Sequence, residues 1–158
     1  LFHYHYILIY LNELMNEVLI LIYIMIIFIS IAFWEAYVEG RYGWATRSVG
    51  WKKKIGRRVL TAYHFWAWLI MIPLFLMLPL VIYGFNPKIF GILLSSYFLG
   101  AVVEDFAWFV VNPKVKLKEF NPRFAKWHNW WDIFGFKIPD FYIIYPIIFL
   151  LIWLLLVK

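Results

Sequence analysis

The chain has 158 residues, of which 65% are hydrophobic and 23% aromatic, and its mean hydropathy is +0.78. Soluble domains use roughly 45–50% apolar residues, so this composition excludes a soluble globular protein and predicts an all-α membrane protein that folds as one transmembrane domain, residues 1–158. Cysteine is absent, which excludes disulfides and thiolate metal sites, and the net charge of +6 is concentrated in two loops, so no nucleic-acid partner is expected.

The first predicted span covers about residues 14–38. Its central part, 18–33, contains no charged side chain and, with its flanks, reaches the ~20 residues that a membrane crossing needs. Glu35 and Glu39 follow near its end, and Gly40 and Gly43 are expected to terminate the helix.

The second predicted span covers about residues 58–83. The loop before it, 40–56, mixes Arg and Lys with Tyr and Trp, a composition typical of the lipid headgroup region. His64 lies near the start of the span, and Pro73 and Pro79 predict a kink within it.

The third predicted span, 89–111, follows a tight turn at 84–88 and carries two acids, Glu104 and Asp105. A carboxylate at membrane depth costs about 3 kcal/mol or more and is by default a sign of function. The first half of this span is rich in small residues that allow close helix packing, and Asn112 and Pro113 end it.

The second long loop, 114–139, contains His128 and Asp132. These two side chains would share a helical face, and could fold back over the bundle as a lid, if the segment around them is helical. The fourth predicted span, about 140–157, is plainly apolar, and Asp140 is expected to cap its N-terminus.

The basic residues predict an orientation. Nearly all of them lie in the two long loops. By the positive-inside rule both loops are expected in the cytoplasm, which predicts a four-transmembrane-helix bundle with both chain ends outside, located in the cell membrane as a multi-pass protein.

The predicted topology brings several polar groups to one depth. With a rise of ~1.5 Å per residue, Glu104 lies about 12 Å, His64 about 9 Å and Glu35 about 6 Å from the cytoplasmic ends of their spans. Glu35 and Glu39 share one helical face, and Glu104 shares another with Trp108, while Asp105 points about 100° away. A cytoplasm-facing pocket of Glu and His residues follows.

This pocket is a candidate site for a divalent metal, since carboxylates mixed with imidazoles suit Fe, Mn or Zn. The candidate ligands are Glu35, Glu39, His64, Glu104, Asp105 and His128. Glu104, His64 and His128 are the candidate catalytic groups, and Arg41 and Arg57 are the candidates for holding an anionic head group of a lipid or other amphipathic substrate. The Glu-x-x-His pairs of di-iron bundles are missing, which disfavours a standard di-iron oxidase.

Two other classes of function remain open. The acids could form a structural ion-pair network with Arg41, Arg57, Arg58 and His64, in a non-enzymatic membrane subunit or assembly factor that docks a partner protein. A small ion or metal transporter is the third alternative, and it would require a homo-oligomer because four helices alone offer little for alternating access.

Four segments carry a resemblance. They read EG..GWA at 39–45, TxYH at 61–64, VEDF.WF..NP at 103–113 and FNP....WH at 120–128. In these segments the chain resembles a group of small prokaryotic four-span membrane proteins. That group has no assigned activity, so the resemblance implies the fold and draws attention to the same acids and histidines without implying a mechanism.

Overall fold

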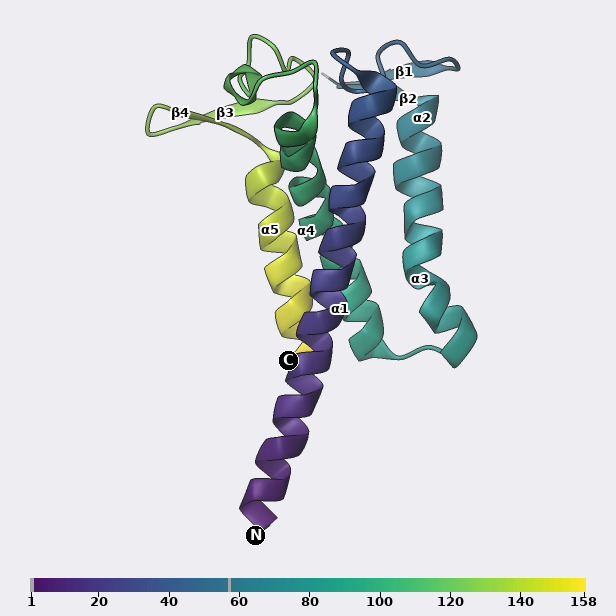
Figure 1. Ribbon diagram of the computed structural model, residues 1–158, viewed down its shortest axis with the longest axis vertical. Coiled ribbons are helices and arrows are strands. Elements are labelled where there is room, and N and C mark those ends of the chain that lie inside the picture. Colours follow the sequence, from purple (N-terminus) through teal and green to yellow (C-terminus); the bar gives the residue numbers. More distant parts are fainter. Residues whose placement is uncertain (1, 57) are drawn as a thin grey trace.

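The computed structural model describes residues 2–56 and 58–158, and most of them are helical (Figure 1). Three stretches are long and apolar enough to cross a membrane, Met15–Glu39, Ala62–Tyr83 and Pro87–Val111, and a shorter apolar stretch follows at Phe141–Val157. Large apolar side chains such as Leu74, Phe75 and Leu155 are exposed, as expected for helices that are surrounded by lipid.

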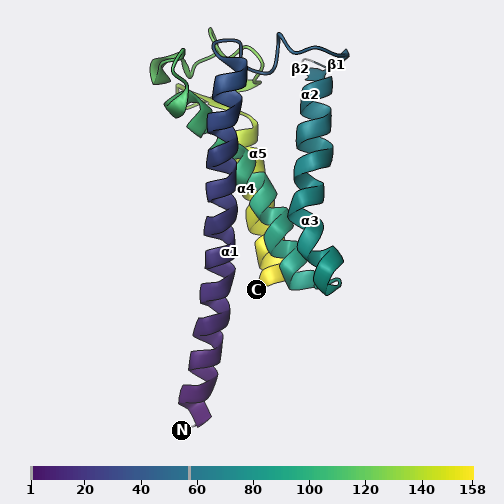
Figure 2. The same ribbon diagram turned by 45° about the vertical axis from the view of Figure 1, so that its right-hand side comes forward.

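The first helix, α1 (Phe2–Glu39), packs most extensively against α4 (Pro87–Val111). Phe28 of α1 is fully buried against Gly100 of α4, where any larger side chain would overlap its ring. The small residues of the third span therefore allow the close helix contact that they predicted. The N-terminal part of α1 projects well beyond the other helices (Figures 1 and 2).

The second long apolar segment, Ala62–Tyr83, is composite. It consists of a helical turn, α2 (Ala62–His64), a π-helix, η1 (Phe65–Met71), and α3 (Ile72–Tyr83). The irregularity expected from Pro73 and Pro79 takes the form of the π-helix before Pro73. The ribbons of this segment and α1 are separated in Figure 2, and side chains such as Phe28 and Ile72 pack in the space between them.

Helix α2 begins at Ala62, four residues later than the start near Arg58 that the sequence suggested. The reason is a hairpin, in which β1 (Lys52–Ile55) pairs antiparallel with β2 (Arg58–Thr61). The Thr61 hydroxyl then accepts a hydrogen bond from the backbone N–H of His64 at 3.2 Å and caps the helix.

A second hairpin forms in the other long loop, from β3 (Trp130–Ile133) and β4 (Phe136–Pro139). The helical arrangement considered for this loop is therefore wrong, because Asp132 lies in a strand and faces away from the site. Asp132 is exposed and pairs with Lys137, whose hydrogen bond holds the pKa of that carboxyl below its usual range. Both hairpins lie at the same end of the bundle (Figure 1).

Polar contacts fasten the two loops to each other and to the helix ends. The side-chain amide of Asn112 donates to the backbone oxygen of Gly40 at 2.6 Å, which joins the ends of α4 and α1. Arg41 pairs with Glu119 at 2.5 Å, at the end of the short helix η2 (Leu117–Glu119). The pKa of Glu119 is lowered by the backbone N–H of Lys116 and by Arg41.

The shorter apolar segment, Phe141–Val157, consists of α5 (Phe141–Ile152) and a π-helical end, η3 (Trp153–Val157). Asp140 accepts a hydrogen bond from the backbone N–H of Phe141 at 2.8 Å, which confirms its expected role as N-cap. Arg58 of β2 pairs with the same carboxylate and so ties the first hairpin to the start of α5.

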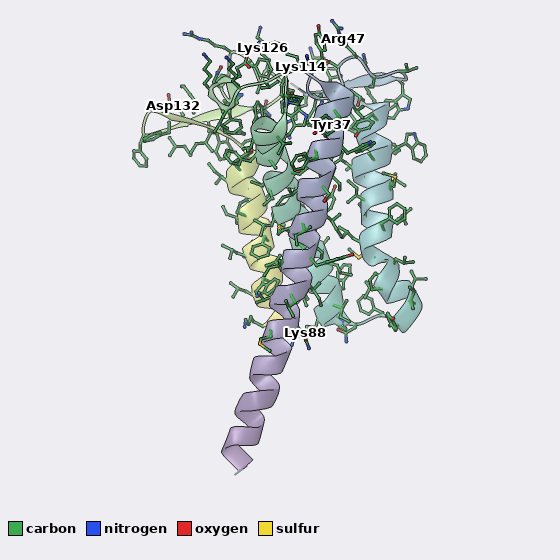
Figure 3. The ribbon with its side chains drawn as sticks, in the orientation of Figure 1. Tyr37, Arg47, Lys88, Lys114, Lys126 and Asp132 are labelled. Carbon is green, nitrogen blue, oxygen red and sulfur yellow. The ribbon has the colours of Figure 1, made fainter. Side chains whose placement is uncertain are left out.

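The charged residues divide between the two ends of the molecule. Figure 3 shows Arg47, Lys114 and Lys126 at the end that carries the hairpins, and Lys88 at the other. Lys88 pairs with the buried Glu17 of α1 at 2.6 Å, which fixes α1 to the start of α4 away from the loops.

Candidate functional site

A cavity of about 170 Å³ lies at the hairpin end of the bundle, between α1, the α2–η1 segment, α4, α5 and the loops. Four carboxyl side chains, two imidazoles and seven Phe, Trp or Tyr rings line it. The lining residues are Glu35, Glu39, Gly43, Trp44, Arg58, Leu60, His64, Trp68, Leu69, Tyr97, Ala101, Glu104, Asp105, Trp108, Trp127, His128, Phe141 and Tyr145.

Glu35 joins α1 to the second long apolar segment, Ala62–Tyr83. Its Oε1 accepts hydrogen bonds from the Tyr63 hydroxyl and from Trp68 Nε1, both at 2.9 Å. The carboxyl group of Glu35 therefore adds two hydrogen bonds to the apolar packing between the two elements, as well as lining the cavity.

Glu104 is the most deeply placed acid of the site, with 4% of its surface exposed. Glu35 of α1 lines the same cavity. Oε1 of Glu104 is buried and has no hydrogen-bond partner among the described residues. One turn further along α4, the buried Trp108 Nε1 is also without a described partner.

Glu39 organises the loop that follows α1. Its Oε1 accepts a hydrogen bond from the backbone N–H of Ala45. Trp44 and Ala45 both have left-handed backbone conformations, with φ of 61° and 43°, which are unfavourable for residues with a side chain. The strained turn places the Trp44 ring on His64, with ring centres 4.0 Å apart and planes inclined by 22°.

His64 is held in position from two sides. Trp44 covers one face of the ring, and Nδ1 lies 2.9 Å from the Thr61 hydroxyl. Nε2 takes part in no hydrogen bond that the structure describes. This nitrogen is therefore the one available to exchange a proton with a molecule in the cavity.

Asp105 contacts residues of α5 and of the second loop. Tyr142 of α5 donates to Oδ2 at 2.7 Å, and His128 Nε2 lies 3.2 Å from Oδ1 without the alignment of a hydrogen bond. His128 is buried, and its ring lies 5.2 Å from that of Phe141. The contact brings the second loop onto the cavity.

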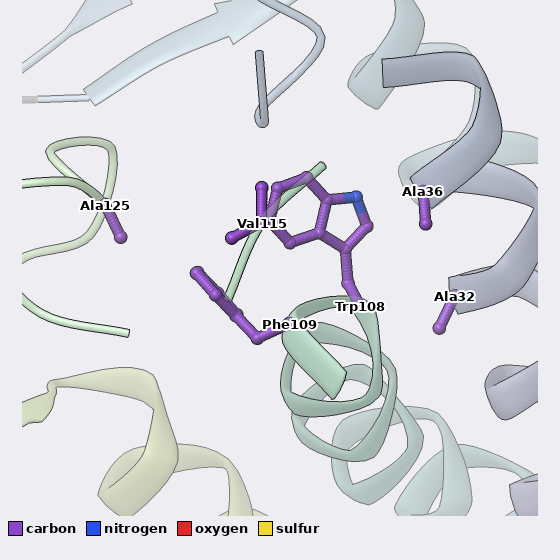
Figure 4. Packing of buried hydrophobic residues seen from close by; sticks show 6 residues of the cluster. All are labelled: Ala32, Ala36, Trp108, Phe109, Val115 and Ala125. Atoms are coloured by element: carbon purple, nitrogen blue, oxygen red, sulfur yellow. The ribbon is translucent and has the colours of Figure 1, made fainter. Parts of the chain in front are cut away.

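An aromatic cluster supports this end of α4. Trp108 and Phe109 pack between Ala32 and Ala36 of α1 on one side and Val115 and Ala125 of the second loop on the other (Figure 4). The two alanines of α1 leave room for the indole ring. The loop is thereby seated on the bundle by apolar packing as well as by hydrogen bonds.

The structure brings most of the predicted site residues together and leaves Arg41 out. Glu35, Glu39, His64, Glu104, Asp105 and His128 all line the cavity. Arg41 does not, because its guanidinium binds Glu119 and the backbone oxygen of Lys114. Arg57 lies outside the described residues. Arg58, which the sequence placed only in an ion-pair network, does line the cavity.

The side chains predicted as metal ligands mostly contact other groups of the protein. Among the described residues, no group of three or more His, Asp or Glu side chains is placed to hold a metal ion. Glu39 is bound to the loop backbone, Glu35 to Tyr63 and Trp68, and Asp105 to Tyr142. Each carboxyl thus faces protein donors.

Sequence reasoning missed several aromatic members of the site. Four of them contact the acids or His64, namely Trp44, Tyr63, Trp68 and Tyr142. Trp and Tyr are so frequent in this chain that the sequence favoured a role at the membrane interface for them. The position of Tyr63 beside His64 in the TxYH segment was the one available signal. No pattern in the sequence pointed to Tyr142.

The fold and site define a mostly helical protein with three helices long and apolar enough to span a membrane, and with an acidic, aromatic-walled cavity at the end that carries its hairpins. Comparisons of the chain with protein-family models, with curated proteins and with solved structures find no match.

Proposed function

We propose that the protein is a multi-pass enzyme of the cell membrane that acts on the polar head of a lipid or other amphipathic substrate. The observation that carries the proposal is the unpartnered Glu104 oxygen in the cavity. A buried carboxyl oxygen without a donor costs about 1–3 kcal/mol or more, and a substrate group that donates to it recovers this free energy.

The chemistry we propose is acid–base catalysis. In this scheme Glu104 acts as the acid, and His64 acts as the base through Nε2 while Thr61 and Trp44 fix its ring. A positioned acid and base of this kind contribute typically 10²–10⁴-fold to a rate. His128 closes the cavity from the loop side in this scheme.

An apolar groove beside the cavity suits the hydrocarbon part of such a substrate. It has a volume of about 1040 Å³ and lies along α2, η1 and α3, with Trp34 of α1 at its edge. Tyr63 belongs to both places, since its ring lines the groove while its hydroxyl binds Glu35 of the cavity. A head group in the cavity and a chain in the groove would meet at Tyr63.

The proposal also includes the orientation of the protein in the membrane. The hairpin end, with most of the Lys and Arg residues, would face the cytoplasm, and both chain ends would lie outside. The cavity then opens on the cytoplasmic side, and a substrate reaches it from the inner leaflet.

The test is conversion of lipids by the purified protein in nanodiscs, followed by mass spectrometry of a total polar-lipid extract. We expect at least one amphiphile to be consumed, at a rate that falls by about 10²-fold or more in Glu104→Gln and His64→Phe. Asp132→Asn, an exposed acid of the hairpin, is the matched control and should keep the rate. No conversion, or conversion that both site variants retain, would refute the proposal.

Elemental analysis of the same samples tests whether the proposed reaction depends on a bound metal. Stoichiometric Fe, Mn or Zn that is lost in the Glu104→Ala, His64→Ala double variant would make the cavity a metal site. Activity without stoichiometric metal would assign the reaction to the side chains alone.

A second candidate function is that of a membrane subunit or assembly factor, and the β3–β4 hairpin favours it. Phe134 at its tip is 97% exposed, and Phe136 and Trp131 are also exposed. Exposed aromatic residues at a loop tip are typical of docking surfaces. A stable heteromeric complex in native mass spectra, lost in Phe134→Asn, would favour this function.

A further inference from the structure

We propose that the cavity selects a head group with a primary ammonium rather than a phosphate. The proposal concerns the substrate class of the site described above and rests on the proposed function in placing an amphiphile there. Its basis is the charge and the hydrogen-bonding capacity of the side chains that line the cavity.

The lining charges are unbalanced in favour of carboxyl groups. Arg58 is the one Lys or Arg among the described lining residues, and its guanidinium is bound to Asp140. Asp105 has His128 at 3.2 Å. Glu35, Glu39 and Glu104 have no Lys or Arg ion pair within residues 15–56 and 58–158. Among the described lining residues, an anionic head would meet three carboxyl groups and no Lys or Arg free of an ion pair, so it is disfavoured.

The unpartnered atoms specify the hydrogen bonds of the ligand. Glu104 Oε1 is buried and accepts from no described donor, so the ligand must bring an N–H or O–H. An ammonium brings both the donor and the charge, and a charge-assisted hydrogen bond is roughly twice as strong as a neutral one. A quaternary ammonium has no N–H and would leave this oxygen without a partner.

The aromatic walls of the cavity suit the same ligand. Trp44, Trp68, Trp108, Trp127 and Tyr97 line it together with the acids. Aromatic rings attract organic cations by about 0.5–2 kcal/mol per contact, most strongly when the site is dry. Hydrated inorganic cations fit such walls poorly because they retain their water. Acids within aromatic walls therefore favour an organic cation.

The basic residues of the loops are compatible with a cavity that prefers an ammonium group. Arg41 and Lys137 hold acids of the loops themselves, and Arg47 lies over the ring of Tyr42. These side chains stand outside the cavity, where they would meet the phosphates of the surrounding bilayer. The bilayer surface and the cavity thus have opposite preferences for charge.

The experiment compares three probes of equal chain length on the intact protein in nanodiscs of zwitterionic lipid. They are n-decylammonium, n-decyltrimethylammonium and n-decyl phosphate, and binding is followed by quenching of tryptophan fluorescence. We expect saturable binding of decylammonium with an affinity at least tenfold above that of either other probe. Equal or tighter binding of decyl phosphate or of the trimethyl probe would overturn the proposal, and this comparison needs no variant.

Two variants then locate the binding. Glu104→Gln should weaken decylammonium at least tenfold, whereas Asp132→Asn should leave it unchanged; equal affinity in wild type and Glu104→Gln would also overturn the proposal. n-Butylammonium distinguishes the two sources of the amine. If only decylammonium binds, the ligand is a lipid; if n-butylammonium binds equally well, the ligand is a free amine.

The two proposals can fail separately. Selective ammonium binding without conversion of any amine would leave the head-group assignment standing and refute the enzyme. Conversion of a neutral or anionic amphiphile, without ammonium binding, would do the reverse.

Discussion

Gly100 shows how much a single position decides in this bundle. A side-chain carbon added there would overlap the fully buried ring of Phe28, so the contact between α1 and α4 depends on its absence. The same two helices carry Glu35 and Glu104, which line one cavity, and Glu104 lies four residues beyond Gly100. Helix packing and the geometry of the site are therefore linked at this residue.

We predict that Gly100→Ala lowers the free energy of unfolding by about 1–3 kcal/mol, the usual cost of overpacking. Denaturation in detergent, followed by circular dichroism, measures it. A double-mutant cycle is the control, because Phe28→Ala removes the ring and should make Gly100→Ala nearly neutral in that background. Additive losses in the double variant would show that the overlap with Phe28 is not the cause.

The β3–β4 hairpin has an unusual turn at the level of the element. Its two central residues, Phe134 and Gly135, have φ of 51° and 84°, which is the conformation that Asn-Gly pairs favour. A bulky residue with positive φ is unfavourable, and Phe134 is also 97% exposed. A residue that costs stability in two ways is a candidate for contact with something outside the chain, either the membrane surface or a partner.

We predict that Phe134→Asn stabilises the isolated protein by about 0.5–1 kcal/mol, because Asn tolerates the left-handed conformation. Thermal unfolding in detergent measures this. Phe136→Asn is the matched control, since it removes an equally aromatic side chain from a strand, where no positive φ is present, and should give no gain. Destabilisation by Phe134→Asn would mean that the ring packs on the protein.

At the scale of the whole molecule, both hairpins, the cavity and most basic residues share one end (Figures 1 and 3). The chain has no cysteine, so single cysteines can be introduced without background labelling. We predict that Lys53→Cys and Lys126→Cys are protected from a membrane-impermeant maleimide in intact cells, and that Phe85→Cys in the opposite turn is labelled. Cell lysis is the control and should expose all three sites, while the opposite pattern would reverse the proposed orientation.

Much of the architecture was predictable because the length of an apolar run can be read directly from consecutive residues. Uninterrupted apolar runs identified the long helices, and Asn112 with Pro113 marked the end of α4. The site could be outlined in the same way, since the depths of Glu35, His64 and Glu104 follow from helix rise and loop direction. All three do line one cavity.

The loops could not be predicted, because their structure depends on non-local pairing. Arg58 and Thr61 looked like the start of a span and instead form a strand with Lys52 and Ile55. Asp132 looked like a helical partner of His128 and instead pairs with Lys137 across a hairpin. Charge and aromatic content indicated a surface segment without specifying its hydrogen bonds.

By itself, the sequence determined that the chain has helices long and apolar enough to span a membrane, that these helices carry acids, and that its basic loops share one end, because composition, helix rise and chain direction are sufficient for each. The tertiary structure alone decided which partners the acids have. Glu39 turns to the loop backbone, Asp105 to Tyr142, and Glu104, which lines the cavity, keeps one buried oxygen without a described partner. Those contacts join residues far apart in the chain, and close packing of the bundle selects among them.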